Sequence, residues 1–289
     1  MPNKLKLAIG NAKLEKDTLI LSLPPGHTCL FAKECRSHTD RITGKIRDGK
    51  HCRFRCYAVT AESLFPNIRK ARWYNFELLR KAKTVIGMAN LIEAGLLNRK
   101  KIKLVRFHQS GDFFSQTYFD AWLLVAKHHP ELIFYGYTKA LSYWIKRFGE
   151  IPPNFKLVAS YGGTSDNLID TFNLRSAKVV FSEKEAKDLG LELDHDDTHC
   201  WKYNKDFAIL LHSTQPAGSL AGKAWYQISK HGPGGYKSDY FGHYGKKKKK
   251  TIAVPVVKVI PSWQHKNNIS PKVLAKVSTT FKKAIHAKI

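Results

Sequence analysis

The sequence predicts an α/β protein built on a partial or complete β/α barrel of the TIM type, with an N-terminal cysteine-bearing segment. From about residue 101, short apolar runs alternate with amphipathic stretches five times in the same order. This alternation is typical of parallel strands joined by right-handed helical crossovers. Polar residues follow nearly every apolar run, as in barrels whose strands share one active-site mouth. We therefore expect a barrel rather than an open doubly wound sheet.

The strands and helices of this region follow from the spacing of the apolar residues. Residues 116–129 predict a helix, because Phe119, Trp122, Leu123 and Ala126 recur at three- and four-residue intervals. Apolar runs predict strands at 103–107, 131–138, 155–160, 177–182 and 206–213. Helices are predicted at 116–129, 140–148, 183–190 and 217–232, and a further one begins near 165.

We expect the whole chain, residues 1–289, to form a single domain. Its predicted parts are the cysteine segment with a long helix at 72–97 (1–100), the core β/α repeats (101–235), and a basic loop, strand and C-terminal helix (236–289). The last helix is amphipathic and basic, and Ser270 is a plausible N-cap for it.

The composition indicates a globular protein with a polyanionic partner. Hydrophobic residues make up 43% of the 289 residues, and no apolar run approaches the about 20 residues that span a bilayer. No secretory signal is visible, so we expect a cytoplasmic protein with reduced thiols and no membrane partner. The net charge is +26, from 49 Lys and Arg against 23 Asp and Glu. Such a charge favours nucleic acid as the partner, and we expect DNA ahead of RNA.

Four of the five cysteines, Cys29, Cys35, Cys52 and Cys56, lie within residues 27–58. In a reducing compartment, clustered cysteines bind metal or carry chemistry more often than they form disulfides. We therefore predict a metal centre with these four as candidate ligands. Their spacing is not that of a zinc ribbon, so an iron–sulfur cluster and a zinc ion both stay open. The alternative is that some of them are ordinary buried cysteines.

Polar residues at the carboxyl ends of predicted strands form the second group of candidates. In "RFHQSGDFFSQ" the strand ends near Phe107, so His108 and Asp112 stand where β/α folds hold their sites. Lys139 follows the next strand in the same way. The alternative is that Asp112 or Ser115 is the N-cap of the following helix.

The segment "ELDHDDTHCW" is locally acidic in a basic chain. Its carboxylates and imidazole suit acid/base chemistry or a divalent metal, and the alternative is an exposed acidic turn. The predicted catalytic residues of the chain are His108, Asp112, Lys139 and Asp194. The predicted substrate-binding residues are Ser110, Tyr137, Ser160, His195, Asp196, Asp197, His212 and Gln215.

Several motifs resemble those of the phage gene product 88 family, in order and in spacing, over roughly residues 20–235. They are "TCLFAKEC…RCYA", "RFHQSGDFFSQTYFDAW", "FYGYTKAL", "LVASYGG", "DHDD" and "LLHSTQPAGS". That family is itself similar to radical-SAM-like phage proteins. The resemblance implies a β/α barrel with a cysteine-bound cluster at its mouth, encoded by a phage or mobile element and present in the host cytoplasm. It matches Cys29, Cys35 and Cys56 as ligands of a 4Fe–4S cluster and suggests S-adenosylmethionine as a second cofactor.

Three functions are compatible with these features. The first is a radical-SAM-like iron–sulfur enzyme that acts on nucleic acid. The second is a zinc-stabilised barrel that exchanges or modifies a base through a carboxylate nucleophile, Asp112 or Asp194, as tRNA-guanine transglycosylases do. The third is a non-enzymatic nucleic-acid-binding protein. Either enzyme needs the base out of the stack, and the interleaved aromatic residues would serve as stacking surfaces.

Overall fold

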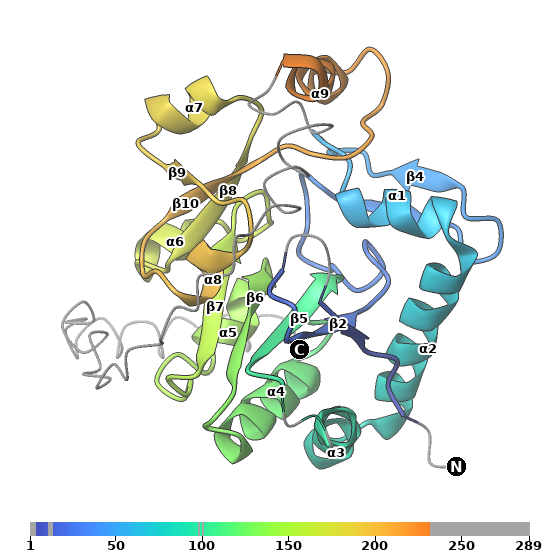
Figure 1. Ribbon diagram of the computed structural model, residues 1–289, viewed down its shortest axis with the longest axis vertical. Coiled ribbons are helices and arrows are strands. Elements are labelled where there is room, and N and C mark those ends of the chain that lie inside the picture. Colours follow the sequence, from blue (N-terminus) through green and yellow to red (C-terminus); the bar gives the residue numbers. More distant parts are fainter. Residues whose placement is uncertain (1–3, 11–13, 98, 100, 232–289) are drawn as a thin grey trace, which may run out of the picture. The chain divides into compact units, whose positions relative to one another are not determined.

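The computed structural model describes residues 4–10, 14–97, 99 and 101–231, and its main feature is an eight-stranded sheet (Figure 1). The strands, in their order across the sheet, are β1 (Ala8–Ile9), β2 (Thr18–Ser22), β5 (Leu104–Ser110), β6 (Ile133–Thr138), β7 (Phe155–Ser160), β8 (Ser176–Val180), β10 (Phe207–Leu210) and β9 (Glu192–Leu193). All neighbours are parallel except β1, which is antiparallel to β2. The α/β class and its parallel strands are confirmed.

The sheet is open within the described residues, so the prediction of a complete barrel is not supported. Its two ends are the two-residue strands β1 and β9, each of which pairs with one neighbour. From β2 to β8 the strand order follows the sequence without reversal, and β10 continues it. A doubly wound sheet would reverse its order at a switch point. Because the strands from β2 to β10 run parallel, their carboxyl ends meet at one edge of the sheet.

The predicted strands and helices of the β/α region are present, with ends shifted by a few residues. The connecting helices are α4 (Gln116–His128), α5 (Leu141–Ile145), α6 (Asn167–Thr171), α7 (Glu183–Asp188), α8 (Thr198–Trp201) and α9 (Leu220–His231). Ser115 caps α4, because its hydroxyl accepts a hydrogen bond from the Tyr118 amide at 3.1 Å. Of the two predicted N-cap candidates, Asp112 and Ser115, Ser115 is therefore the one that caps α4.

The predicted long helix at 72–97 is wrong, because the chain forms two helices there. They are α2 (Pro66–Ala82) and α3 (Val85–Leu96), which follow a short helix α1 (Tyr57–Leu64) that the sequence analysis missed. Lys83 adopts a left-handed conformation with φ 58°, which ends α2. Thr84 then caps α3 by accepting a hydrogen bond from the Gly87 amide at 3.0 Å. Apolar periodicity continued across this break and concealed it.

Aromatic side chains fill the core beneath β5, β6 and β7. The rings of Phe107 and Phe155 are stacked with centroids 4.8 Å apart, and Trp122 of α4 packs against Phe107. Gly136 in β6 allows this packing, since a Cβ there would lie 2.5 Å from the Phe107 carbonyl oxygen. Helix α3 lies beside α4, as Figure 1 shows. This core holds the strand ends that carry the polar candidates.

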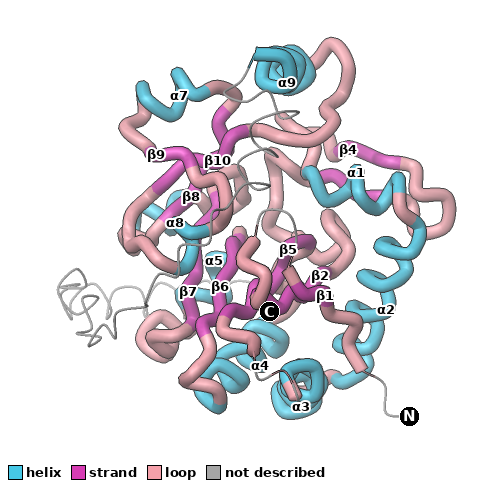
Figure 2. The backbone as a smooth tube through the Cα atoms, in the orientation of Figure 1, coloured by secondary structure: helices cyan, strands magenta, loops and turns pink. Residues whose placement is uncertain are grey.

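A two-stranded antiparallel hairpin stands apart from the main sheet. It consists of β3 (Ser37–Thr39) and β4 (Ile46–Asp48) and lies beside α1 (Figure 2). None of the described helices is long and apolar enough to cross a membrane. The predicted loop, strand and helix of residues 236–289 lie outside the described residues.

Candidate active site

A cavity of about 480 Å³ lies at the carboxyl ends of the parallel strands. The predicted site residues that line it are Cys29, Cys35, Cys56, His108, Ser110, Asp112, Tyr137, Lys139, Ser160, Asp194, His195, Asp197 and His212. They come from the ends of β5, β6, β7 and β10, from the connection between β9 and α8, and from the cysteine segment. Open α/β sheets bind ligands at this edge, because loops from several strands converge there.

Three of the predicted metal ligands form one wall of this cavity. Cys29 and Cys35 lie in the loop between β2 and β3, and Cys56 immediately precedes α1. Burial raises the pKa of the Cys29 thiol well above its ordinary value, and Asp112, Cys56 and Cys35 raise it further by Coulombic repulsion. Burial and Cys35 likewise raise the pKa of Cys56. Burial and the neighbouring thiols therefore disfavour ionisation of Cys29 and Cys56.

Cys52, the fourth predicted ligand, does not line the cavity. Its thiol donates a hydrogen bond to the Phe54 carbonyl at 3.1 Å and lies 3.4 Å from the Ser37 hydroxyl. All five cysteines are free, and Cys200 is buried. As the side chains stand, the described residues contain no group of three His, Cys, Asp or Glu side chains arranged around a single ion.

Asp112 joins the ends of two neighbouring strands. Its Oδ1 accepts hydrogen bonds from the Phe113 amide and the Thr138 hydroxyl, both at 2.7 Å, and its Oδ2 accepts one from the Lys139 amide at 2.8 Å. Burial raises its pKa in spite of these bonds. Both carboxylate oxygens are therefore engaged in holding the β5 and β6 ends together, which argues against Asp112 as a free nucleophile.

We expect Asp112→Asn to destabilise the protein by about 1–3 kcal/mol, because an amide nitrogen would face one of three buried donors. Chemical denaturation measures the free energy of unfolding of wild type and variant. Asp188→Asn is a suitable control, since Asp188 is 59% exposed and pairs with Lys184 on a helix surface. Its expected cost is below about 0.5 kcal/mol. Equal stabilities for the two variants would contradict the structural role of Asp112.

Lys139 follows β6, and its side chain reaches Ser160 at the carboxyl end of β7. Its Nζ donates to the Ser160 hydroxyl at 2.5 Å and lies 3.3 Å from the Ser160 carbonyl oxygen. Lys139 is only 7% exposed, so its charge acts in a partly desolvated cavity. It is one of the groups that lower the pKa of Cys56. The cation therefore favours negative charge on the cysteine wall.

A second group of lining residues is acidic and is tied to a buried arginine. The Tyr137 hydroxyl is 3.3 Å from both Asp194 Oδ2 and Asp197 Oδ1, and Arg106 on β5 donates to Asp197. His199 joins Asp194, with its Nδ1 3.1 Å from Oδ1. Burial, followed by repulsion from Asp197, raises the pKa of Asp194. An acid of raised pKa beside a solvent-facing cavity suits proton transfer.

His108 is the most enclosed of the predicted catalytic residues. Its ring lies 4.5 Å from that of Phe113, and its Nε2 is 3.1 Å from the Tyr118 hydroxyl. Burial, and secondarily the charge of Arg106, lowers its pKa from 6.5 to about 3. His108 is therefore neutral at neutral pH. Its backbone is left-handed with φ 57°, as is that of Asp197 with φ 65°, and such conformations cluster at functional sites.

Two predicted substrate-binding residues form hydrogen bonds that stabilise the fold and do not face the cavity. Asp196 accepts hydrogen bonds from the amide and hydroxyl of Thr198 at the start of α8. The Gln215 amide bonds to the backbone N–H and carbonyl of Arg55, which ties two distant loops together. Neither residue lines the cavity.

The sequence analysis also missed residues that do line it, notably Tyr57 and Arg106. Arg106 had a visible signal, because it is a charged residue in the middle of a buried apolar strand. A buried charge needs a partner or a ligand, and Asp197 supplies the partner. Tyr57 had no comparable signal.

Comparisons with known proteins agree with the family resemblance. The sequence profile of the family described as gene product 88 matches residues 3–227. The chain is 36% identical over 90 residues to the Gene 88 protein of Mycobacterium phage L5 and 33% identical over 90 residues to that of Mycobacterium phage D29. Each alignment covers 29% of this chain and 38% of the relative's length.

No solved structure matches the chain. The names of the two relatives do not refer to radical-SAM chemistry, which stays a prediction. The family profile extends from the N-terminal segment into α9 and so includes the sheet and all the lining residues of the cavity except Ile228. On this match, the chain belongs to the gene product 88 family of phage proteins.

Proposed function

We propose that this chain is a phage metalloenzyme that acts on nucleic acid, with Cys29, Cys35 and Cys56 as ligands of an iron–sulfur cluster in the cavity. The observation that carries the proposal is that these three thiols line the same cavity as Lys139 and Asp194. Burial and neighbouring thiols raise the pKa of Cys29 and Cys56, so their thiolates are unfavourable unless a cation neutralises them. A catalytic metal centre is a physical reason to keep them together.

The donor set fits a polynuclear cluster. Three thiolates from two loops are typical cluster ligands, and each thiolate would bind a different iron, so the sulfurs need not surround a single point. A zinc ion requires four ligands at about 2.0–2.3 Å from one centre. Lys139 and Arg72 both lower the pKa of Cys56 and so offset the negative charge of a thiolate-bound cluster. When bound, such a cluster would supply one-electron chemistry, with S-adenosylmethionine as the cofactor that the family resemblance suggests.

Two features of the protein favour a nucleic-acid substrate. The net charge of +26 favours a polyanion, and a volume of about 480 Å³ suits a group the size of a nucleoside. The rings of Tyr57 and His212, 4.9 Å apart, line the cavity and offer a stacking surface for a base. Asp194 and Asp197 would accept hydrogen bonds from its amino groups. A base must leave its stack to reach such a site.

The test is the metal content of protein purified without oxygen and reconstituted with iron and sulfide. We expect iron and sulfide to be bound, with broad visible absorption that reductant bleaches. Each of Cys29→Ala, Cys35→Ala and Cys56→Ala should lose most of the iron. Cys52→Ala is the matched control from the same segment and should keep it, because its thiol contacts Ser37 and Phe54 instead of the cavity.

Circular dichroism of each variant separates loss of metal from loss of fold. A colourless wild-type protein with one tightly held zinc would overturn the cluster and support a base-exchange enzyme. Wild-type protein that takes up no metal at all would overturn the metal centre. If Cys52→Ala loses as much iron as Cys56→Ala, the assignment of three ligands is wrong.

A further inference from the structure

The segment of residues 33–55, which contains the β3–β4 hairpin, carries a dense and largely uncompensated positive charge. It holds eight Lys and Arg residues against three Asp and Glu residues. Three of the arginines form ion pairs with described carboxylates: Arg41 with Glu77, Arg53 with Glu34, and Arg55 with Asp48. The remaining cations are exposed and form no ion pair with any carboxylate that the structure describes. They are Lys33, Arg36, Lys45, Arg47 and Lys50.

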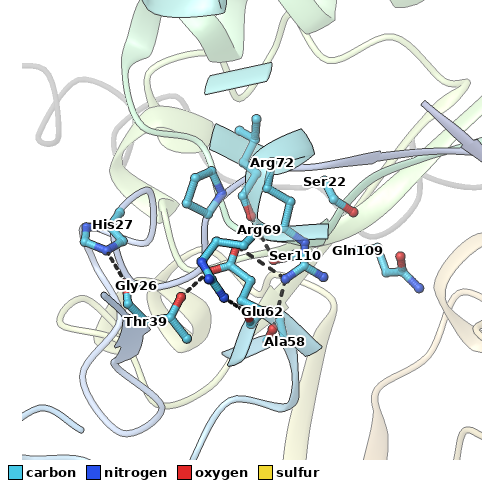
Figure 3. Close-up of polar contacts among 12 residues, drawn as sticks. Ser22, Gly26, His27, Thr39, Ala58, Glu62, Arg69, Arg72, Gln109 and Ser110 are labelled. Atoms are coloured by element: carbon cyan, nitrogen blue, oxygen red, sulfur yellow. Dashed lines mark hydrogen bonds and ion pairs between the residues drawn. The ribbon is translucent and has the colours of Figure 1, made fainter. Parts of the chain in front are cut away.

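The inner face of this segment is held rigidly on α1 and α2. The buried Thr39 hydroxyl donates to Glu62, as Figure 3 shows. The Arg69 guanidinium donates to the carbonyl oxygens of Arg41 at 3.0 Å and Ile42 at 3.2 Å. Gly44, with φ 74°, permits this contact, since a Cβ there would lie 2.5 Å from Arg69 Nη1. The exposed cations therefore extend from a fixed scaffold, which lowers the entropy cost of binding.

The segment also begins and ends at the cavity. Cys35, which lines the cavity, precedes β3, and Arg55 and Cys56, which also line it, follow β4. The exposed Arg36 is adjacent to Cys35 in the chain. His38 on β3 feels the charges of both Arg47 and Arg36, which lower its pKa after the effect of burial. Arg36 and Arg47 therefore lie close to β3, which follows the cavity residue Cys35 in the chain.

We propose that residues 33–55 form a docking surface for the phosphate backbone of nucleic acid, which delivers a base or nucleotide to the adjacent cavity. This inference rests on the proposed function, because it names the surface that the nucleic-acid substrate would use. Surfaces that track a phosphate backbone combine spread cations with a nearby stacking site, and the rings of Tyr57 and His212 supply the latter. An anionic membrane is less suited, since the only strongly exposed large apolar side chain of this segment is Ile42.

The experiment compares two quadruple variants of the full chain that lose the same formal charge. The hairpin variant replaces Arg36, Lys45, Arg47 and Lys50 with glutamine. The control variant replaces four exposed lysines that precede β5 or lie in the last turns of α2 and α4, with the same substitution: Lys81, Lys101, Lys103 and Lys127. Affinity for labelled single-stranded DNA, duplex DNA and single-stranded RNA of one sequence is measured over a series of salt concentrations.

We expect the hairpin variant to bind its preferred nucleic acid roughly tenfold or more weakly than wild type at low salt. Its slope of log affinity against log salt should be shallower by about three, as four lost phosphate contacts require. The control variant should keep the wild-type slope. Circular dichroism verifies that both variants are folded.

The outcomes separate the inference from the proposed function. If wild-type protein binds none of the nucleic acids at low salt, the nucleic-acid part of the proposed function fails and the docking surface with it. If wild type binds but the two variants lose affinity equally, or the hairpin variant loses none, only the docking surface is wrong. Tighter binding to vesicles of anionic phospholipid than to any nucleic acid, abolished in the hairpin variant, would assign the surface to a membrane and overturn the inference.

Discussion

Replacing Arg72 with methionine is expected to destabilise the protein by about 3–5 kcal/mol, because it leaves a buried carboxylate without its cation. The Glu62 side chain is fully buried, and Arg72 Nη1 lies 3.5 Å from its Oε1. The same nitrogen donates to the Ala58 carbonyl at 2.9 Å, so the substitution also leaves that oxygen without its donor. Chemical denaturation at neutral pH measures the loss.

Two further variants show whether the uncompensated charge is the cause. In the double variant Glu62→Leu/Arg72→Met, both charges are gone, and much of the lost stability should return. Arg147→Met removes an arginine from a partly exposed pair with Asp120, and we expect a cost of about 1 kcal/mol or less. A double variant no more stable than Arg72→Met would show that lost packing, and not charge, accounts for the effect.

The Arg72→Met defect should also depend on pH. Burial raises the pKa of Glu62 even in the wild-type protein, and Arg72 opposes that rise. Without Arg72, the pKa of Glu62 in the folded protein rises further above its value in the unfolded chain. A carboxyl group with a raised pKa stabilises the fold only while it is protonated, so its contribution is lost as pH rises through the folded-state pKa. The stability difference between wild type and Arg72→Met should therefore be larger at pH 8 than at pH 5.

Much of the β/α region could be predicted because each element has a local signal. The strand at 155–160 coincides with β7, and the helix at 116–129 differs from α4 by one residue. The break between α2 and α3 could not be predicted, since it depends on the left-handed conformation of Lys83, a residue with no turn preference. Closure of the sheet is not a local property either, because it depends on how the two end strands pair.

The site shows the same division between local signals and tertiary structure. Polar residues at strand ends could be placed at one edge, because parallel strands share a direction, and Asp112 and Asp194 both line the cavity there. The different roles of Asp112 and Asp194 could not be predicted. Asp112 is occupied by three donors that come from β6 and from its own loop, whereas Asp194 is paired with His199. Likewise, spacing alone could not separate Cys52 from the cysteines of the cavity.

The second large effect concerns His108, which should make the folded protein sensitive to acid. Its pKa is lowered from 6.5 to about 3, mainly by burial and secondarily by Arg106. A histidine whose pKa falls on folding stabilises the protein above its unfolded-state pKa, and this contribution is lost as pH falls toward the folded-state value. Each pKa unit corresponds to about 1.4 kcal/mol, so the fall of the His108 pKa from 6.5 to about 3 contributes about 5 kcal/mol to the stability of the folded protein. About 2 kcal/mol of this contribution is lost by pH 5.

His108→Asn isolates this contribution. Asparagine tolerates the left-handed backbone at φ 57°, retains a polar group toward the Tyr118 hydroxyl and does not titrate. We expect wild type to lose about 2 kcal/mol relative to His108→Asn between pH 7.5 and pH 5, measured by denaturation at each pH. Acidic residues such as Asp112 titrate in both proteins, so the difference between the two curves reports His108 alone. A difference that stays constant with pH would mean that His108 is already solvated enough to accept a proton in the folded state. It would then be a candidate for proton transfer in the cavity instead of a neutral member of the aromatic core.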